Sequence, residues 1–413
     1  MTLLADLLST VFERRLRAAD PGHDSRTTPE LMKALVGATG EVSGLVIAGL
    51  ILTRVEAMDD ADKLEFFHQM AAMNIDPSRV RDTLATYEET PDKASYRAFL
   101  AAAEPPRQEL IRRLNQVPGA TGRLVRMRAD LLRLGRGDAD LQALDLDFRH
   151  LFASWFNRGF LVLRPINWSS PAQILDKIIA YEAVHAIDSW DDLRRRLQPD
   201  DRRCFAFFHP AMPDEPLIFV EVALTSGVPG SVQQLLAEDR APMQATDADA
   251  AVFYSISNCQ AGLASVSFGN SLIKQVAADL SAELPGLKTF VTLSPIPGLM
   301  KYVTDTAENV DISDDTTMRQ LAAHYLINAK TNAGQPLDSV ARFHLGNGAL
   351  VHAIHARADI SDKGMAQSGG VMVNYLYDLG RVSQNHERFA SAAEVIADAE
   401  PRALAAAYLK TQS

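Results

Sequence analysis

The spacing of apolar residues changes near residue 150, and this change constrains the fold more than any other feature of the sequence. Before it, apolar residues recur three and four positions apart, as in the stretch 124–134, which is the period of an amphipathic helix. After it, the chain carries short apolar runs rich in β-branched and aromatic residues, which are typical of strands. A chain of 413 residues is also long for one average domain. The sequence therefore predicts an α+β protein, with an all-helical domain over 1–146 and a mixed α/β domain over 147–413.

A polar residue followed by proline marks the predicted helix starts in the first domain. Such pairs stand at Thr28-Pro29, Asp76-Pro77 and Thr90-Pro91. A proline at the first helical position loses no hydrogen bond, because that amide has no partner within the helix. No cluster of polar groups in this domain suggests a site, so we expect the domain to serve packing and oligomer assembly.

Strand-like runs and helix caps alternate in the second domain. Capping residues predict helices that start near Ser170 and Ser189. The stretch 374–377, which holds two tyrosines, fits a packed amphipathic helix. The predicted strands cover residues 160–163, 205–208, 217–224, 251–257, 288–293 and 349–354.

Charge and composition exclude several classes of protein. The net charge of −11 argues against broad nucleic-acid binding, which needs a basic face. The apolar runs are too short to cross a membrane, and the acidic residues near the N-terminus do not fit a secretion or transit signal. Cys204 and Cys259 do not make a disulfide scaffold, and histidines and carboxylates do not cluster at metal-ligand spacing. We therefore expect a cytoplasmic protein with no nucleic-acid partner, no membrane contact and no metal.

One stretch of the second domain has the order strand, loop, helix, strand. Small residues and two glycines fill the loop 260–270, between the predicted strand 251–257 and a helix predicted over 272–284. Such a loop can turn backbone amides toward a phosphate at the helix N-terminus, where the helix dipole also favours negative charge. Loops of small residues before helices are common, however, so the pattern alone does not decide between phosphate binding and an ordinary connection.

Two further side chains stand in rigid surroundings. Ser294 opens the segment SPIPG at the end of the predicted strand 288–293, which is a usual place for ligands in α/β sheets. His344 stands in the segment FHLGNGA, just before a turn. Each residue alone has an ordinary explanation, since most turn serines serve the turn and most single histidines are structural.

Five segments of the second domain together resemble the malonyl-CoA decarboxylase family. They begin at His209, Phe253, Thr292, Phe343 and Gly369 and read HPAMPDEPLIFVEVALT, FYSISNCQAGLASVSFGNSLIKQV, TLSPIPG, FHLGNGA and GGVMVNYLY. They occur in the order found in that family. The resemblance extends over residues 155–377 and is weaker in the helical part.

The resemblance implies a fold, an assembly and a set of site residues. The implied fold is a helical N-terminal domain followed by a GNAT-like (acetyltransferase-type) catalytic domain, and the implied assembly is a homo-oligomer, a dimer or a tetramer. Ser294 and His344 match the catalytic serine and histidine of the family, and Tyr377 matches a substrate-binding tyrosine. Some members have a glutamate where this chain has Ser267, so no role of that carboxylate carries over. The loop that contacts coenzyme A corresponds to Ala264, Ser265, Val266, Ser267, Phe268, Gly269 and Asn270.

The implied activity is the decarboxylation of malonyl-CoA to acetyl-CoA and CO2, in fatty acid and malonate metabolism. The thioester carbonyl of the substrate can accept the electron pair that CO2 leaves behind, so we expect no cofactor. His344 would protonate the resulting carbanion, and Ser294 would bind the malonyl carboxylate or exchange a proton with it. The chemistry does not require a covalent intermediate on Ser294. The alternatives are a CoA-dependent acyltransferase on the same fold and a CoA-binding protein without catalysis.

Overall fold

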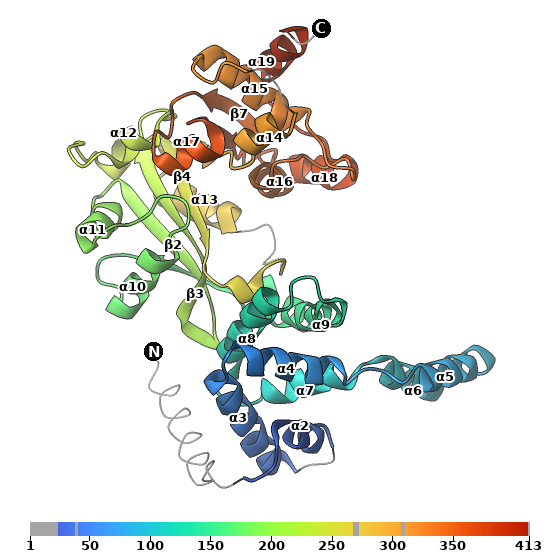
Figure 1. The fold of residues 1–413 in the computed structure, drawn as a ribbon. Helices are drawn as coiled ribbons and strands as arrows, with labels where there is room; N and C mark the ends of the chain where they lie inside the picture. The colour runs from blue at the N-terminus through green and yellow to red at the C-terminus, as the bar shows by residue number, and fades with distance from the viewer. Residues whose placement is uncertain (1–23, 38–39, 267–271, 307–309, 412–413) are drawn as a thin grey trace. The chain divides into compact units, whose positions relative to one another are not determined.

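The computed structural model describes residues 24–37, 40–266, 272–306 and 310–411, and the chain divides into two compact units. The first unit contains the chain up to Leu161, together with His209–Pro213 and a segment that begins at Gln260. The second unit contains the rest of the chain. Each unit is described by itself below (Figure 1).

The first unit is built from helices, as the apolar spacing predicts. The predicted domain boundary after residue 146 falls inside the last of them, because buried residues continue at helical spacing through Phe148 and Phe152. The helices are α2 (Thr28–Val36), α3 (Glu41–Ala57), α4 (Asp60–Ala71), α5 (Pro77–Glu89), α6 (Lys93–Ala103), α7 (Pro106–Leu114), α8 (Ala120–Leu134) and α9 (Ala139–Trp155).

One predicted helix start in this unit is confirmed, and another is wrong. Asp76 caps α5 as predicted, with its carboxylate accepting hydrogen bonds from the amides of Ser78 and Arg79. The start predicted at Thr90-Pro91 is wrong, because α6 begins two residues later. Asp92 caps that helix, since its carboxylate reaches two amides of the first turn and a threonine forms weaker caps.

The second unit is built around one sheet with the order β1-β2-β3-β4-β5-β8-β6, in which β7 also pairs with β8. Strands β4 and β5 are parallel, with Phe253 opposite Thr292, whereas β3 and β4 are antiparallel. The strands are β1 (Val162–Ile166), β2 (Arg202–His209), β3 (Met212–Thr225), β4 (Ala250–Asn258), β5 (Thr289–Thr292), β6 (Ser294–Pro295), β7 (Leu350–His355) and β8 (Met372–Leu376).

The helix predicted over 374–377 is wrong, because residues 374–376 belong to strand β8 and Tyr377 directly follows its end. The strand lies between β5, β6 and β7, and Asn374 and Tyr375 have no exposed surface. A strand that is covered on both faces loses the alternation of apolar and polar residues, so a short apolar run cannot be told from a buried helix by its period.

Helices pack against this sheet at several places. Helices α10 (Ala172–Tyr181) and α11 (Trp190–Leu197) bury Ile174, Ile178 and Leu193 against β2 and β3. The hydroxyl of Ser189 caps α11 as predicted, but α10 has no side-chain cap, because the hydroxyl of Ser170 accepts the amide of Asn167 instead. On another part of the sheet, α12 (Val232–Leu236) packs against residues of β4 and β5.

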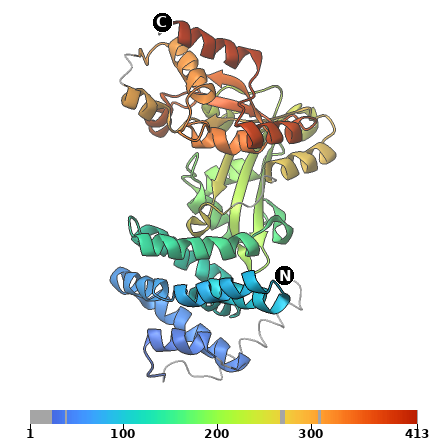
Figure 2. The ribbon, with the colours of Figure 1, turned by 90° about the vertical axis from the view of Figure 1, so that its right-hand side faces the viewer.

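The C-terminal part of the unit is again helical. Helices α15 and α19 lie side by side in both views (Figures 1 and 2). Among the described residues, no helix is long and apolar enough to cross a membrane. The remaining helices are α13 (Leu272–Glu283), α14 (Leu299–Thr306), α15 (Asp315–Ile327), α16 (Ser339–Gly346), α17 (Asp362–Ser368), α18 (Val382–Ala392) and α19 (Ala399–Thr411).

Candidate active site

Ser294 lies at the point where the chain leaves β5 and enters β6. The side chain is buried, with 5% of its surface exposed. Its Oγ lies 2.8 Å from the Oγ1 of Thr292 and 3.2 Å from the Nε2 of His344. Pro295 follows directly and fixes the backbone next to Ser294, so the hydroxyl is held in one place.

His344 lies in the last turn of α16, just before the turn that the sequence predicts. Asp338 caps the start of this helix by accepting the amide of Ala341 at 2.8 Å. The imidazole is 2% exposed and stacks on the ring of Tyr375, with 4.5 Å between the ring centroids. Its Nδ1 lies 2.9 Å from the hydroxyl of Tyr377. The histidine is therefore held from both ring nitrogens and from one face.

Burial determines the protonation states of His344 and Tyr377. It lowers the pKa of His344 to about 3 and raises the pKa of Tyr377 well above its usual value. At neutral pH the imidazole is therefore neutral and the phenol keeps its proton. The hydroxyl of Ser294 donates to Thr292, so its oxygen accepts from Nε2 of His344; this assigns the ring proton to Nε2 and leaves Nδ1 to accept from the phenol of Tyr377.

A cavity of about 240 Å³ lies beside Ser294 and His344, in the second unit. Most of its wall is apolar, which weakens the hydration of a carboxylate that enters it. Asn258 and Ser339 supply polar atoms at the wall. The lining residues are Val184, Phe253, Tyr254, Ile256, Asn258, Ser294, Pro295, Ser339, Val340, Phe343 and His344.

Glu182 positions one wall of the cavity, and no feature of the sequence predicts this role. Its carboxylate accepts the amides of Val184 at 2.7 Å and His185 at 2.9 Å. It also accepts the hydroxyl of Ser255 on β4 at 2.7 Å. These bonds fix the segment that carries Val184 to the sheet. A glutamate just after a helix has many ordinary roles, so no motif could have marked it.

The residues that the resemblance assigns to the site do not all lie together. Ser294, His344 and Tyr377 meet in the second unit, but Tyr377 is buried against His344 and does not line the cavity. Ala264 and Ser265 are exposed and Val266 is buried, in the part of the loop that belongs to the first unit. Ser267, Phe268, Gly269 and Asn270 lie outside the described residues.

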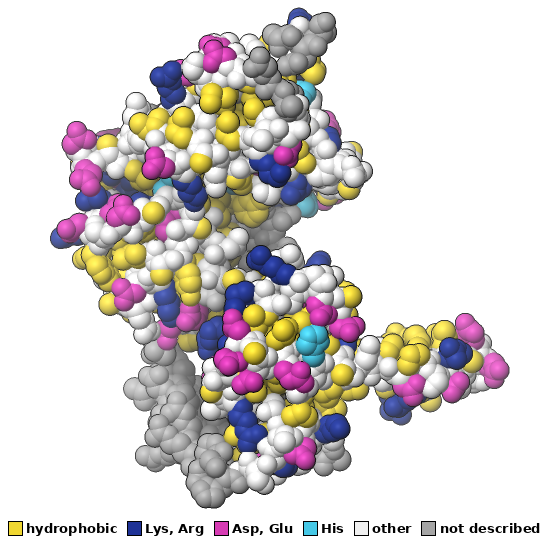
Figure 3. All heavy atoms as spheres, in the orientation of Figure 1, with side chains coloured by type: hydrophobic (Ala, Val, Ile, Leu, Met, Phe, Trp, Pro, Cys, Tyr) yellow, Lys and Arg dark blue, Asp and Glu magenta, His cyan; other side chains and the backbone are white. Residues whose placement is uncertain are grey.

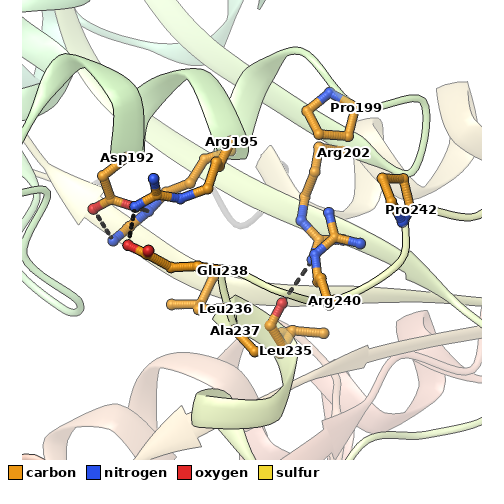
Figure 4. A pocket seen from close by; sticks show the side chains of 11 residues that line it. Asp192, Arg195, Pro199, Arg202, Leu235, Leu236, Ala237, Glu238, Arg240 and Pro242 are labelled. Carbon is orange, nitrogen blue, oxygen red and sulfur yellow. Dashed lines mark hydrogen bonds and ion pairs between the residues drawn. The ribbon is translucent and has the colours of Figure 1, made fainter.

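A second and smaller hollow, of about 80 Å³, is lined by four arginines of the second unit (Figure 4). Arg195 pairs with Glu238 at 2.7 Å, and Arg202 donates to the carbonyl of Leu235 at 2.7 Å. Arg240 pairs with Asp201 at 2.6 Å. These arginines are engaged by protein oxygens, so we place the candidate active site at the larger cavity.

Models of known families match both parts of the chain. The malonyl-CoA decarboxylase C-terminal domain matches residues 159–316 and 307–412, and the malonyl-CoA decarboxylase N-terminal domain matches residues 73–156. The chain belongs to the malonyl-CoA decarboxylase family. The expected fold class is confirmed, with helices first and then the mixed sheet domain.

Solved structures and curated relatives agree with this assignment. The malonyl-CoA decarboxylase of Rhodopseudomonas palustris is 45% identical, with a TM-score of 0.86 over 91% of this chain and 98% of that chain. The corresponding structure from Cupriavidus metallidurans is 34% identical, with a TM-score of 0.72 over 91% of this chain and 98% of that chain. The mitochondrial malonyl-CoA decarboxylase of Anser anser anser is 34% identical over 328 residues, which is 67% of this chain. The match spans 64% of the length of that relative.

Proposed function

We propose that this protein decarboxylates malonyl-CoA to acetyl-CoA and CO2. The observation that carries the proposal is the contact of 3.2 Å between the Oγ of Ser294 and the Nε2 of His344 at the wall of a mostly apolar cavity. The relatives whose printed names are malonyl-CoA decarboxylase support the choice of substrate.

The reaction needs a place for one electron pair and a source of one proton. The bond between the malonyl carboxylate and the neighbouring carbon breaks, CO2 leaves, and the electron pair moves onto the thioester oxygen as an enolate. Protonation of the enolate carbon then gives acetyl-CoA, so each turnover consumes one proton. Ser294 would hold the malonyl carboxylate, and His344 would give the proton to carbon.

The burial of His344 suggests when it receives this proton. The imidazole is neutral at neutral pH, because burial lowers its pKa to about 3. A malonyl carboxylate beside the ring adds a negative charge in a place that excludes water, and a nearby negative charge raises the pKa of an imidazole. His344 would therefore take up its proton as the substrate binds and would pass it to the carbanion after CO2 has left.

The substrate supplies its own electron sink, so we propose that no metal and no organic cofactor takes part. Coenzyme A enters only as a part of the substrate and leaves as a part of the product.

We also propose that the protein is a cytoplasmic homo-oligomer, a dimer or a tetramer. Helices α5 and α6 form a hairpin in the first unit, and α5 buries none of its residues. Leu84, Tyr96 and Leu100 of this hairpin are 38%, 49% and 48% exposed. Hydrophobic side chains gather on it (Figure 3). An exposed apolar surface of this kind suits contact with a second copy of the chain.

Cys204 and Cys259 are free and buried, which suits a reducing compartment.

The test of the proposed activity is release of CO2 from malonyl-CoA by the purified protein with no acyl acceptor present. We expect one acetyl-CoA for each CO2. A CoA-dependent acyltransferase would instead need an amine acceptor and would release free CoA. A binding protein would bind CoA and release no CO2, and that result would contradict the proposal.

A further inference from the structure

We infer that Thr292 is a positioning residue that fixes the direction of the hydrogen bond between Ser294 and His344. The inference rests on the proposed function and deepens it, because Thr292 acts through the two proposed catalytic residues. It gives a role to a side chain of β5 that does not line the cavity.

The side chain of Thr292 is completely buried at the end of β5, and its hydroxyl oxygen accepts two hydrogen bonds. One comes from the hydroxyl of Ser294 at 2.8 Å, and the other comes from the backbone amide of Tyr375 at 3.1 Å. A hydroxyl oxygen has two lone pairs, so both are occupied. The carbonyl of Thr292 also accepts the side-chain amide of Asn374 at 2.7 Å. Thr292 is therefore held by β8 while it holds Ser294.

These contacts set the order of donors and acceptors from His344 to the sheet. A backbone amide can only donate, so the amide of Tyr375 keeps the oxygen of Thr292 as an acceptor. The proton of Ser294 then points at Thr292, and the oxygen of Ser294 accepts from Nε2 of His344 at 3.2 Å. This order is the reverse of that in an activated serine nucleophile, whose hydroxyl donates to the histidine. Thr292 therefore keeps a proton on Nε2, the ring nitrogen beside Ser294.

The same oxygen also supports the ring of His344 through β8. Tyr375 donates its amide to Thr292, and its ring stacks on the imidazole with 4.5 Å between the ring centroids. Tyr375, His344 and Thr292 are all buried, and hydrogen bonds are stronger in such surroundings than in water. One oxygen atom thus ties both members of the Ser294–His344 pair to the sheet.

This order of donors suits the proposed reaction. When the malonyl carboxylate arrives, the hydroxyl of Ser294 would turn from Thr292 to the carboxylate, while its oxygen still accepts from Nε2. Without the hydroxyl of Thr292, the acceptor that remains for Ser294 among its contacts in the described part of the chain is Nε2. His344 would then carry its ring proton on Nδ1, beside Tyr377. The nitrogen next to Ser294 would have no proton to give.

A role limited to stability is the alternative, and Thr121 provides a matched control for it. Thr121 lies on α8 in the first unit and is also buried, and its hydroxyl donates to the side-chain oxygen of Asn115 at 2.8 Å. Thr121→Val and Thr292→Val remove the same group from a buried hydrogen bond of the same length. Valine keeps the branched shape of threonine. The two changes should therefore lower the melting temperature by similar amounts.

The experiment compares Thr292→Val, Thr292→Ser and Thr121→Val with wild type in the full-length protein. It measures kcat and KM for malonyl-CoA, the melting temperature, and the ¹⁵N spectrum of protein labelled only at Nε2 of histidine. The chemical shift of this nitrogen shows whether it carries a proton at neutral pH. The spectrum of His344→Asn identifies the signal of His344 by its loss.

Thr292→Val should lower kcat about tenfold, which corresponds to about 1.4 kcal/mol in barrier. Its KM should stay within about threefold of wild type, because Thr292 does not line the cavity. Nε2 of His344 should carry a proton in wild type and lose it in Thr292→Val. Thr292→Ser should behave like wild type, because it keeps the hydroxyl. Thr121→Val should keep the kcat and the Nε2 signal of wild type.

The inference is overturned if Nε2 of His344 has the same protonation in Thr292→Val as in wild type, or if the kcat of that variant stays within about threefold of wild type. It is also overturned if Thr121→Val lowers kcat as much, or if Thr292→Ser does not restore kcat. If Thr292→Val does not fold, Thr292→Ala is judged by the same criteria. A wild type that releases no CO2 refutes the proposed function, and the ¹⁵N spectra, which need no turnover, then decide the order of donors alone.

Discussion

His344 and Ser294 are single side chains whose effect on turnover can be measured directly. If His344 supplies the proton, His344→Asn should keep the affinity for coenzyme A and lower kcat by about 10²–10⁴-fold. Ser294→Ala should lower kcat by a similar factor, because its hydroxyl contacts the same ring nitrogen. The kcat of the double variant should be only slightly below that of the less active single variant, because residues that act together give non-additive losses.

The measurement is kcat and KM for the four proteins, with circular dichroism to verify folding. Additive losses would show that the two residues act independently. Single variants within about threefold of wild type, less than 1 kcal/mol in barrier, would remove both residues from the mechanism.

Tyr377 donates to the Nδ1 of His344, so Tyr377→Phe tests the orientation of the ring. The change keeps the packing of the phenyl ring but removes the donor to Nδ1. An unpartnered buried acceptor costs about 1–3 kcal/mol, so kcat should fall by roughly 5–150-fold. KM should change little, because Tyr377 does not line the cavity. A rise in KM with unchanged kcat would instead assign Tyr377 to direct substrate contact.

Glu221 is a buried carboxyl group whose ionisation opposes folding. Burial raises its pKa to about 8, and the charge of Glu182 adds to this effect against the attraction of Arg196. Its folded pKa lies above the unfolded value of 4.5, so its contribution to stability is complete below pH 4.5 and is lost as the pH rises toward 8.

Glu221→Gln removes this titration, so the variant should gain stability over wild type by about 1.4 kcal/mol for each pH unit in that range. Urea unfolding at pH 5, 6 and 7 measures the difference. The control is Glu283→Gln, which makes the same substitution at an exposed carboxylate that pairs with Arg203. A constant difference for Glu221→Gln would contradict the assignment.

At the scale of the elements, the sequence predicted the strands that carry the site better than the helix ends. The apolar runs that became β2, β3, β4, β5 and β7 stand out by composition, because β-branched and aromatic residues fill them. The run at 374–377 was misread, because β8 is covered on both faces and has no alternation. The contact between Ser294 and His344 could not be found from spacing, because it joins residues 50 positions apart and depends on how α16 packs beside β6.

The α5–α6 hairpin is the element whose surface tests the proposed assembly. Leu100→Glu places a charge on the exposed apolar face of α6, and a buried charge without a partner is unfavourable in an interface. The mass measured by light scattering should fall toward that of one chain. Leu146→Glu changes another exposed leucine, on α9, and should leave the mass unchanged. Equal masses for both variants and wild type would exclude the hairpin as the interface.

At the scale of the whole molecule, the decarboxylation should not depend on a metal ion. In the proposed mechanism the malonyl thioester would accept the electron pair, and Ser294 and His344 would make the polar contacts to the substrate. Prolonged treatment with EDTA followed by gel filtration should therefore leave kcat unchanged. A loss of activity that a divalent metal restores would contradict this prediction.

The helical unit is not completed by the N-terminal part of the chain alone. His209 lies on a later segment of this unit, and its Nε2 contacts the carbonyl of Trp155 at 3.1 Å. Arg128 of α8 donates a hydrogen bond to the carbonyl of Gly262, which lies 134 residues later in the sequence. A ribosome adds about 5–20 residues each second, so the roughly 100 residues between Leu161 and Val266 take about 5–20 s to make. During that interval the guanidinium of Arg128 and the backbone of α8 at Val125 lack their final partners. The first unit to be synthesised is therefore finished late, and its completion on the ribosome depends on the sheet that follows it.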